Sequence, residues 1–387
     1  MKPQPEIRTL FILGAGASRA AGAPLMFDFM ESAAKTHRRK ESAWAQESFD
    51  CVINARRKLQ VAYAKSSVDL DNIENLFSTF EMASLVGRLG GLPKDLVETL
   101  PNHLRSVIMR TLEQTILYPI TGREGIVPSP YPYDDFAHLL LALSRVNELA
   151  PLAVMSFNYD LCLEYALLRA GLHPEYALGH APPTDKGSIP LYKVHGSLNW
   201  CRKEDTRTIE ASPVRPLQMR TYWERYGLNK PRDFPVDTME LLYGPTEWGA
   251  AIHPRPVIVP PTWNKGVYQE MLKPVWREAS AALASAENIF VIGYSLPPSD
   301  QFFRSFYSLS TISDSIIERF WIFDPSESNE VADRFRSMLG PAVRERNKFK
   351  CERSSFVDAI NHLADTFGFE PTNVGGRNEP LRAQIAR

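Results

Sequence analysis

The sequence has few cysteines, and none of them form a CxxC pair. Its four cysteines lie far apart, at Cys51, Cys162, Cys201 and Cys351. This spacing argues against a zinc ribbon and against a disulfide framework, and it is typical of a protein in a reducing cytoplasm. We therefore expect a cytoplasmic protein that binds no metal.

Long apolar runs and an excess of either charge are also absent. No run approaches the roughly 18 apolar residues that a membrane-spanning helix needs, and the amino-terminal MKPQPEIRTL lacks the organisation of a signal peptide. The 44 basic residues are balanced by 45 acidic ones, so nothing in the overall charge points to nucleic acid. The densest basic run, residues 37–40, is most simply a solvated helix face. We expect no association with membranes and no direct binding of nucleic acid.

Short apolar runs recur along the chain, and each ends in a polar, proline or glycine cluster. These runs are Arg8–Leu13, Ala153–Ser156, Leu191–Val194, Pro256–Val259, Asn288–Ile292 and Phe320–Phe323. Their length is that of strands buried on both faces. Helical periodicity fills most of the gaps, as in Glu270–Ala286 and Ser355–Phe367. The alternation predicts an α/β fold with a Rossmann-like parallel sheet, helices on both faces, and ligands bound at the carboxyl ends of the strands.

Two stretches interrupt this alternation. Residues 27–148 are mostly helical, and we expect them to form a helical subdomain inserted after the first βα unit. Residues 201–253 are rich in proline, arginine and aromatic residues but show little periodicity, so we expect an irregular insertion that serves as a lid or a partner surface. Residues 1–370 are predicted to be one interrupted domain, followed by a loose tail at 371–387.

The first predicted strand runs directly into the sequence GAGAS. Glycines at 14 and 16 allow a close approach of the backbone to a phosphate, a following helix N-terminus would face the anion, and Ser18 adds a hydroxyl donor. The alternative is a tight strand–helix turn without a ligand. Arg19 stands where a dehydrogenase fingerprint has its third glycine, and no acidic residue ends a second strand about twenty residues later. This pattern favours nucleotide binding and disfavours hydride transfer.

Two further strand ends carry an asparagine and a histidine that can work together. Asn158 and Asp160 follow one strand in SFNYD, and His195 follows another in KVHGSLNW. An amide can orient a hydroxyl or a water, and an imidazole can accept the proton from it. Taken singly, Asn158 could be a turn residue, His195 a structural group, and Asp160 a helix cap. Their common edge of the predicted sheet makes a catalytic pair the better interpretation.

Four motifs in order, GAGAS-x-x-x-GAP, FNYD, HGSLNW and GYSLPPSD, resemble the sirtuin superfamily of NAD-dependent enzymes. The resemblance is closest to bacterial sirtuin-like proteins associated with antiphage defence. It covers about residues 8–26, 153–200 and 256–330, and neither insertion. It implies an enzyme of NAD in which Asn158 positions the attacking water beside the nicotinamide ribose and His195 is the catalytic base.

The resemblance also implies where the rest of NAD binds. The residues expected to line the pyrophosphate are Gly14, Ala15, Gly16 and Ser18. Asp160 would face the nicotinamide carboxamide. Gly293 and Ser295 would approach the pyrophosphate or the adenosine ribose, and Asp324 would take the place where sirtuins bind that ribose.

Two departures from the deacylase pattern indicate the reaction. Deacylase sirtuins carry a four-cysteine zinc module, and their glycine loop continues into Pro-Asp-Phe-Arg, whereas here Pro24 is followed by Leu25-Met26-Phe27. Without the zinc module an acyl-lysine groove is not expected, so water becomes the acceptor. The predicted function is an NAD glycohydrolase that forms nicotinamide and ADP-ribose from NAD as substrate.

Other interpretations stay open at this point. The alternatives are a protein deacylase or an ADP-ribosyltransferase at the same site, and a catalytically silent sensor of NAD or ADP-ribose. The resemblance further implies a regulated antiviral effector that depletes NAD, forms a homo-oligomer and pairs with a HerA-type ATPase. The trigger, the stoichiometry and the choice between linear and cyclic ADP-ribose are not encoded in any recognisable motif.

Overall fold

The computed structural model describes residues 6–39, 43–60, 68–146, 149–178, 187–202, 208–226, 231–244, 256–259, 266–298, 300–312, 315–344 and 347–369. The predicted tail, residues 371–387, lies outside these ranges. No helix within the described ranges is both long enough and apolar enough to cross a membrane.

A seven-stranded sheet forms the centre of the molecule, in the order β12-β11-β10-β1-β3-β5-β4. The strands are β1 (Thr9–Leu13), β3 (Leu152–Ser156), β4 (His173–Glu175), β5 (Ser188–Lys193), β10 (Asn288–Ile292), β11 (Arg319–Phe323) and β12 (Phe349–Glu352). Every neighbouring pair is parallel. The predicted Rossmann-like α/β fold is confirmed.

The register aligns the strand ends. Leu13, the last residue of β1, pairs with Ile292 of β10 and with Ser156 of β3. Ile292 in turn pairs with Phe323 of β11, and Ser156 pairs with Lys193 of β5. The loops that begin at residues 14, 157, 194, 293 and 324 therefore open along one edge of the sheet.

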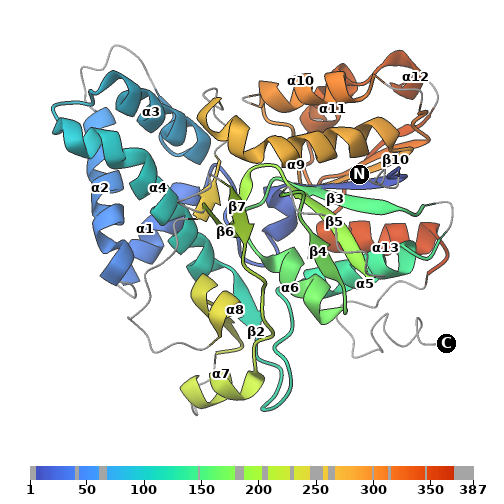
Figure 1. Cartoon of the computed structure of the whole chain (residues 1–387), viewed down its shortest axis with the longest axis horizontal. Coiled ribbons are helices and arrows are strands. Elements are labelled where there is room, and N and C mark those ends of the chain that lie inside the picture. Colours follow the sequence, from blue (N-terminus) through green and yellow to red (C-terminus); the bar gives the residue numbers. More distant parts are fainter. Residues whose placement is uncertain are drawn as a thin grey trace.

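Helices cover both faces of the sheet (Figure 1). One layer contains α9 (Gly266–Ser285), α10 (Gln301–Ser310) and α11 (Glu330–Met338), and the other contains α5 (Tyr133–Leu143), α6 (Cys162–Arg169) and α13 (Phe356–Thr366). Alternate residues of β1 enter different cores: Phe11 and Leu13 pack with the second layer, and Leu10 and Ile12 pack with the first. Both faces of the sheet are covered by helices and buried from solvent, which explains why its central strands are apolar.

Four helices of the first insertion lie together at one end of the molecule, on the left of Figure 1. They are α1 (Phe29–Arg39), α2 (Ala43–Leu59), α3 (Ile73–Val86) and α4 (Lys94–Thr115). Helix α4 packs against the other three. Helix α5, also within residues 27–148, packs instead against α6 and α13. The last helix of the predicted insertion thus belongs to the layer that covers the sheet.

Residues near the second insertion form short elements: β6 (Gly196–Arg202), β7 (Ile209–Ala211), α7 (Met219–Tyr226), β8 (Asp233–Pro235), α8 (Thr238–Tyr243) and β9 (Pro256–Ile258). Such short pieces produce little periodicity in the sequence. Strand β8 pairs with β2 (Leu117–Pro119), and β6 lies between β7 and β9 in an antiparallel sheet. The prediction that the Pro256 run joins the parallel sheet was wrong. Pro256 has no N–H to donate, and it lies on an edge strand that can accommodate this loss.

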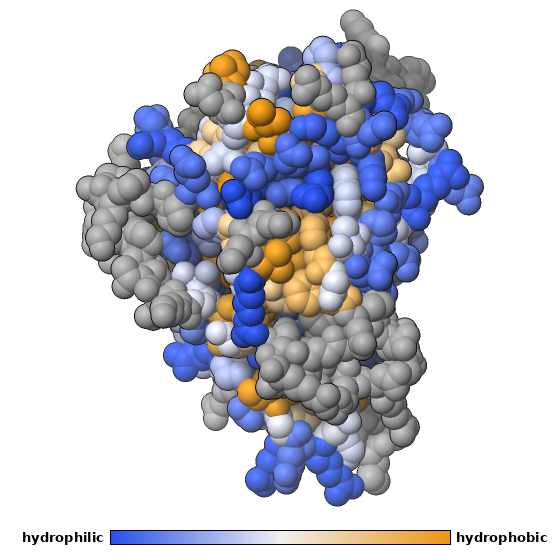
Figure 2. Space-filling view, turned by 90° about the vertical axis from the view of Figure 1, so that its right-hand side faces the viewer, coloured by the Kyte–Doolittle hydropathy of each residue, from blue (hydrophilic) through white to orange (hydrophobic). Residues whose placement is uncertain are grey.

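The side of the molecule that faces away from α1–α4 is shown in Figure 2. Its coloured surface is largely hydrophilic, and the broadest apolar area lies near its centre. Ligands of open parallel sheets bind at the carboxyl ends of the strands, and those ends lie toward α1, α3 and α4 on the opposite side.

The loops after β1 and β10 pack backbone against backbone. The Gly16 N–H donates to the Gly293 carbonyl at 2.9 Å, and the Gly14 N–H donates to that of Ile292 at 3.1 Å. Gly293 has a φ of +65°, and a Cβ on it would lie 2.2 Å from the Ala17 nitrogen. A side chain at position 293 therefore has neither a suitable backbone conformation nor space.

We predict that Gly293→Ala destabilises the protein by about 2–5 kcal/mol, the sum of a left-handed non-glycine residue and an overpacked contact. Chemical denaturation measures this loss. Gly340→Ala is the control, because a Cβ there meets nothing within 4 Å. Equal stability of the two variants would contradict the packing described.

Candidate functional site

A pocket with about 850 Å³ of empty space, its open mouth included, lies over the carboxyl ends of β1, β3 and β5. Four residues singled out from the sequence contribute polar groups to it: Ser18, Asn158, Asp160 and His195. The insertion and the chain leading into it supply the apolar wall, which consists of Met26, Phe29, Ile73, Phe77, Ile108 and Leu112. The sheet edge and the helical insertion thus build the pocket together.

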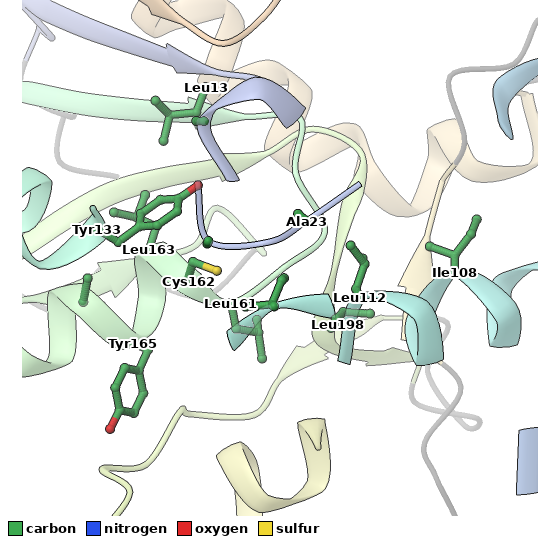
Figure 3. Packing of buried hydrophobic residues seen from close by; sticks show 14 of the residues in the cluster. Leu13, Ala23, Ile108, Leu112, Tyr133, Leu161, Cys162, Leu163, Tyr165 and Leu198 are labelled. Atoms are coloured by element: carbon green, nitrogen blue, oxygen red, sulfur yellow. The ribbon is translucent and has the colours of Figure 1, made fainter. Parts of the chain in front are cut away.

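Asn158 and Ser18 connect the loop after β3 to the loop after β1. The Asn158 amide Nδ2 donates to the Gly14 carbonyl at 2.9 Å and to Ser18 Oγ at 3.1 Å. Ser18 Oγ donates to Asp160 Oδ2 at 2.7 Å and lies 2.7 Å from the Tyr133 hydroxyl. Figure 3 shows Tyr133 directing this hydroxyl toward the loop that follows β1. Asn158 is therefore a long-range connector and not only a local turn residue.

Asp160 also hydrogen-bonds to the start of a helix, which was the alternative interpretation of this residue from the sequence. Its Oδ1 accepts a hydrogen bond from the Cys162 backbone N–H at 3.1 Å, in the first turn of α6. Both oxygens of the carboxylate are thus engaged by protein donors. Its expected role toward the nicotinamide carboxamide stays a prediction.

His195 is buried in the turn between β5 and β6, and aromatic rings surround it. The Phe157 ring contacts the imidazole edge-on with centroids 5.0 Å apart, and the Tyr159 ring lies 6.4 Å away. Phe157 in turn stacks on Tyr294 at 4.1 Å. The His195 carbonyl accepts from the Val259 N–H at 2.8 Å. The backbone and the ring of His195 are both held in place at the pocket.

A buried ion pair beside the pocket escaped the sequence analysis. The Lys193 ammonium lies 2.7 Å from Glu164 Oε1 and donates to the Asp160 carbonyl at 2.5 Å. Burial raises the pKa of Glu164, although Lys193 acts in the opposite direction. Lys193 ends β5 just before His195, so the pair fixes the His195 turn against the Asp160 loop. A lysine in an otherwise apolar strand was the signal that could have revealed it.

The glycine loop differs from the prediction in one respect. A 3₁₀ turn, Ala15–Ser18, follows β1, and the next helix begins only at Phe29. Gly22 has a φ of +102° and lies against the Thr115 carbonyl, and Pro24 follows two residues later, so an α-helix cannot continue here. The expectation of a helix N-terminus facing a phosphate was wrong. Because Gly14 and Gly16 have no side chains, their backbones pack directly against the loop that contains Gly293.

Asp324 lies in a second pocket, over the carboxyl ends of β11 and β12. Arg336 and Arg353 line the same pocket, and Asp324 Oδ1 accepts from the Ser326 N–H at 2.9 Å. Ser295 lines neither pocket, and its carbonyl accepts from Arg334 at 2.9 Å. Strand β10 lies between the two pockets. Of the predicted cofactor residues, Ala15, Ser18 and Asp160 line the first pocket, Asp324 lines the second, and Gly14, Gly16, Gly293 and Ser295 line neither.

Two acidic residues of the main pocket were not assigned a functional role from the sequence. Asp300 caps α10 by accepting from the Phe303 N–H at 3.0 Å, and it also accepts from the Tyr294 hydroxyl at 2.7 Å. Glu74 lies in the first turn of α3 and lines the pocket. Within the described ranges, no three His, Cys, Asp or Glu side chains are arranged to hold a metal ion.

No protein-family model matches the chain, and no curated protein matches it. Solved structures with some similarity include Sir2Tm bound to a propionylated peptide, at 13% identity and a TM-score of 0.39 over 94% of each chain. Others are a Sir2 homologue mutant in complex with ADP-ribose (12% identity, TM-score 0.37, 98% of this chain and 93% of that chain) and Sir2Af2 bound to a myristoylated histone peptide (12% identity, TM-score 0.31, 93% and 92%). Similarities at this level carry no argument about function.

We predict that Lys193→Met lowers the free energy of unfolding by about 3–5 kcal/mol, because it leaves Glu164 buried without its cation. The double variant Lys193→Met/Glu164→Leu should recover most of this loss, since no uncompensated charge then stays buried. Urea denaturation of the single and double variants measures both values. If the double variant is no more stable than the Lys193→Met protein, then Lys193 does not stabilise the fold by neutralising Glu164.

Proposed function

We propose that this chain is a sirtuin-like NAD glycohydrolase, which cleaves the nicotinamide–ribose bond of NAD with water. The observation that carries the proposal is the convergence of Asn158 and His195 in one pocket, although they follow different strands. Their motifs are those on which the resemblance to sirtuins rests. The loops that hold them are fixed by the Ser18 network and the Lys193–Glu164 pair.

The charge of the pocket supports one orientation of the dinucleotide. Glu74, Asp160 and Asp300 are among its described lining residues, and no lysine or arginine is. Carboxylates suit the cationic nicotinamide half of oxidised NAD, and they disfavour phosphates. The second pocket contains Arg336 and Arg353 beside Asp324, which suits the adenosine half and its neighbouring phosphates. We therefore propose that the nicotinamide half of NAD binds beside Asn158 and His195.

Strand order supports the same assignment. Asn158 follows β3 and Asp324 follows β11, with β1 and β10 between them. Three strand intervals of about 4.8 Å each separate the two ends by about 14 Å. The glycines of the β1 and β10 loops lie along this path. A dinucleotide across the sheet edge would pass over them, as in other open parallel sheets.

The proposed chemistry needs few groups. Nicotinamide leaves as a neutral molecule, and its ring nitrogen takes the electron pair of the broken C1′–N bond, so no acid is required. The enzyme has to stabilise an oxocarbenium-like ribose and align a water. Asn158 orients the water, a new C1′–O bond forms, and the proton passes to the His195 imidazole.

Transfer to an acceptor other than water is the second candidate. It is favoured by the apolar wall opposite Asn158 and His195, which would accommodate the apolar part of an acceptor. An ADP-ribosyltransferase or a deacylase would use the same nicotinamide-releasing step. The antiphage role, the homo-oligomer and the HerA-type ATPase partner rest on the motif resemblance alone.

The first test is nicotinamide release from NAD by the purified chain, alone and with a HerA-type ATPase. Asn158→Ala and His195→Ala should each lower the rate by about 100-fold or more, and both proteins should still unfold cooperatively. The thermal transition of Asn158→Ala should be lower, because the Gly14 carbonyl and Ser18 lose its amide. His173→Ala is a control, because His173 is exposed on the edge strand β4. Undiminished turnover in both site variants would overturn the assignment, and tight binding without turnover in the unmodified chain would support the silent sensor.

The assignment of the adenosine end has its own test. Asp324 should repel the 2′-phosphate of NADP, because like charges placed together cost several kcal/mol. We expect Asp324→Asn to lower the preference for NAD over NADP by about tenfold or more, measured as the ratio of kcat/KM values. An unchanged ratio would place the adenosine ribose away from Asp324.

A further inference from the structure

Glu74 is an unusual residue in its surroundings. It belongs to the insertion, it is 7% exposed, and it lines the main pocket. The other pocket residues of α1, α3 and α4 are all apolar: Phe29, Ile73, Phe77, Ile108 and Leu112. Glu74 is therefore the one acidic side chain that these three helices contribute to the described lining of the pocket.

The fold keeps this carboxylate at the pocket. Asn72 caps α3 by accepting from the N–H groups of Glu74 at 2.9 Å and Asn75 at 3.3 Å. Glu74 therefore stands in the first turn of a capped helix, where the helix dipole favours a negative charge. The position of the side chain is determined by the start of α3, and not by the parallel sheet.

The charge of Glu74 acts on other groups in the pocket. Burial is the largest cause of the raised pKa of Tyr159, where Glu74 comes next and Arg105 acts in the opposite direction. Burial and then Asp300 raise the pKa of Tyr294, and Glu74 adds to them. Tyr159 follows β3 and Tyr294 follows β10, so the field of Glu74 reaches both sides of the edge at which β1 ends. The same negative charge would stabilise a cation bound between these loops.

We propose that Glu74 selects the oxidised form of the dinucleotide, since its carboxylate faces the cationic nicotinamide ring and gains nothing from the neutral ring of the reduced form. This inference rests on the proposed function, which puts the nicotinamide half in this pocket. It gives the helical insertion a second task besides lining the site. The insertion then favours binding of the oxidised form, the one whose nicotinamide can leave, over the reduced form.

The experiment compares the dissociation constants of NAD⁺ and NADH in a His195→Ala background, in which the expected consumption of NAD⁺ is about 100-fold slower. Titration calorimetry measures both. Glu74→Gln should lower the preference for NAD⁺ by about tenfold, with the affinity for NADH unchanged. Glu81→Gln is the matched control. Glu81 is a buried carboxylate on the same helix, but it pairs with Arg105 and does not line the pocket. Its substitution should leave the preference unchanged.

A second variant separates charge from shape. Glu74→Asp retains the charge and should retain most of the preference for NAD⁺. An equal loss of preference in Glu74→Asp and Glu74→Gln, or an equal fall in the affinity for both dinucleotides, would overturn the role of the charge. If the His195→Ala protein binds both forms without preference, the inference fails and the proposed function stands. If it binds neither, both fail.

Discussion

The alignment of parallel strand ends is the constraint on which the rest of the structure depends. Because β1, β3, β5, β10 and β11 are parallel and in register, the loops after them open along one edge. No two of the site motifs are adjacent in the sequence, and only this register brings the Asn158 loop next to the His195 turn. The glycines after β1 and β10 then let two loops touch through their backbones. One pocket lies over β1, β3 and β5, and the other lies over β11 and β12.

Buried polar groups hold the loops of this edge in place. Their burial has a desolvation cost, which the burial of the apolar layers offsets. Ser18, Asn158, Asp160 and Tyr133 satisfy one another, and Lys193 neutralises Glu164 where water has no access. A connected network of this kind favours one geometry, and removing one partner from it destabilises the fold. These hydrogen bonds and this ion pair hold the loops that carry the residues proposed for catalysis, and none of them involves a substrate. The pocket can therefore keep its shape before NAD binds.

The sequence predicted the sheet well because its strands are short, apolar and each followed by a polar cluster. It predicted the candidate site in part: Asn158, His195, Ser18, Ala15 and Asp160 line one pocket. Three features were beyond it. The helix expected after Ser18 is replaced by a 3₁₀ turn, since Gly22 packs on a carbonyl of α4 that no local pattern reveals. The Pro256 run pairs antiparallel with β6. Glu74 enters the pocket through the packing of a distant helix, and such packing leaves no motif.

The account is tested most directly by a crystal structure of the His195→Ala variant with NAD. It should contain the nicotinamide ribose beside Asn158, the nicotinamide ring near Glu74, the pyrophosphate over the Gly16–Gly293 contact and the adenosine ribose at Asp324. A dinucleotide in the reverse orientation, with its adenosine beside Asn158, or one bound away from this edge, would contradict it.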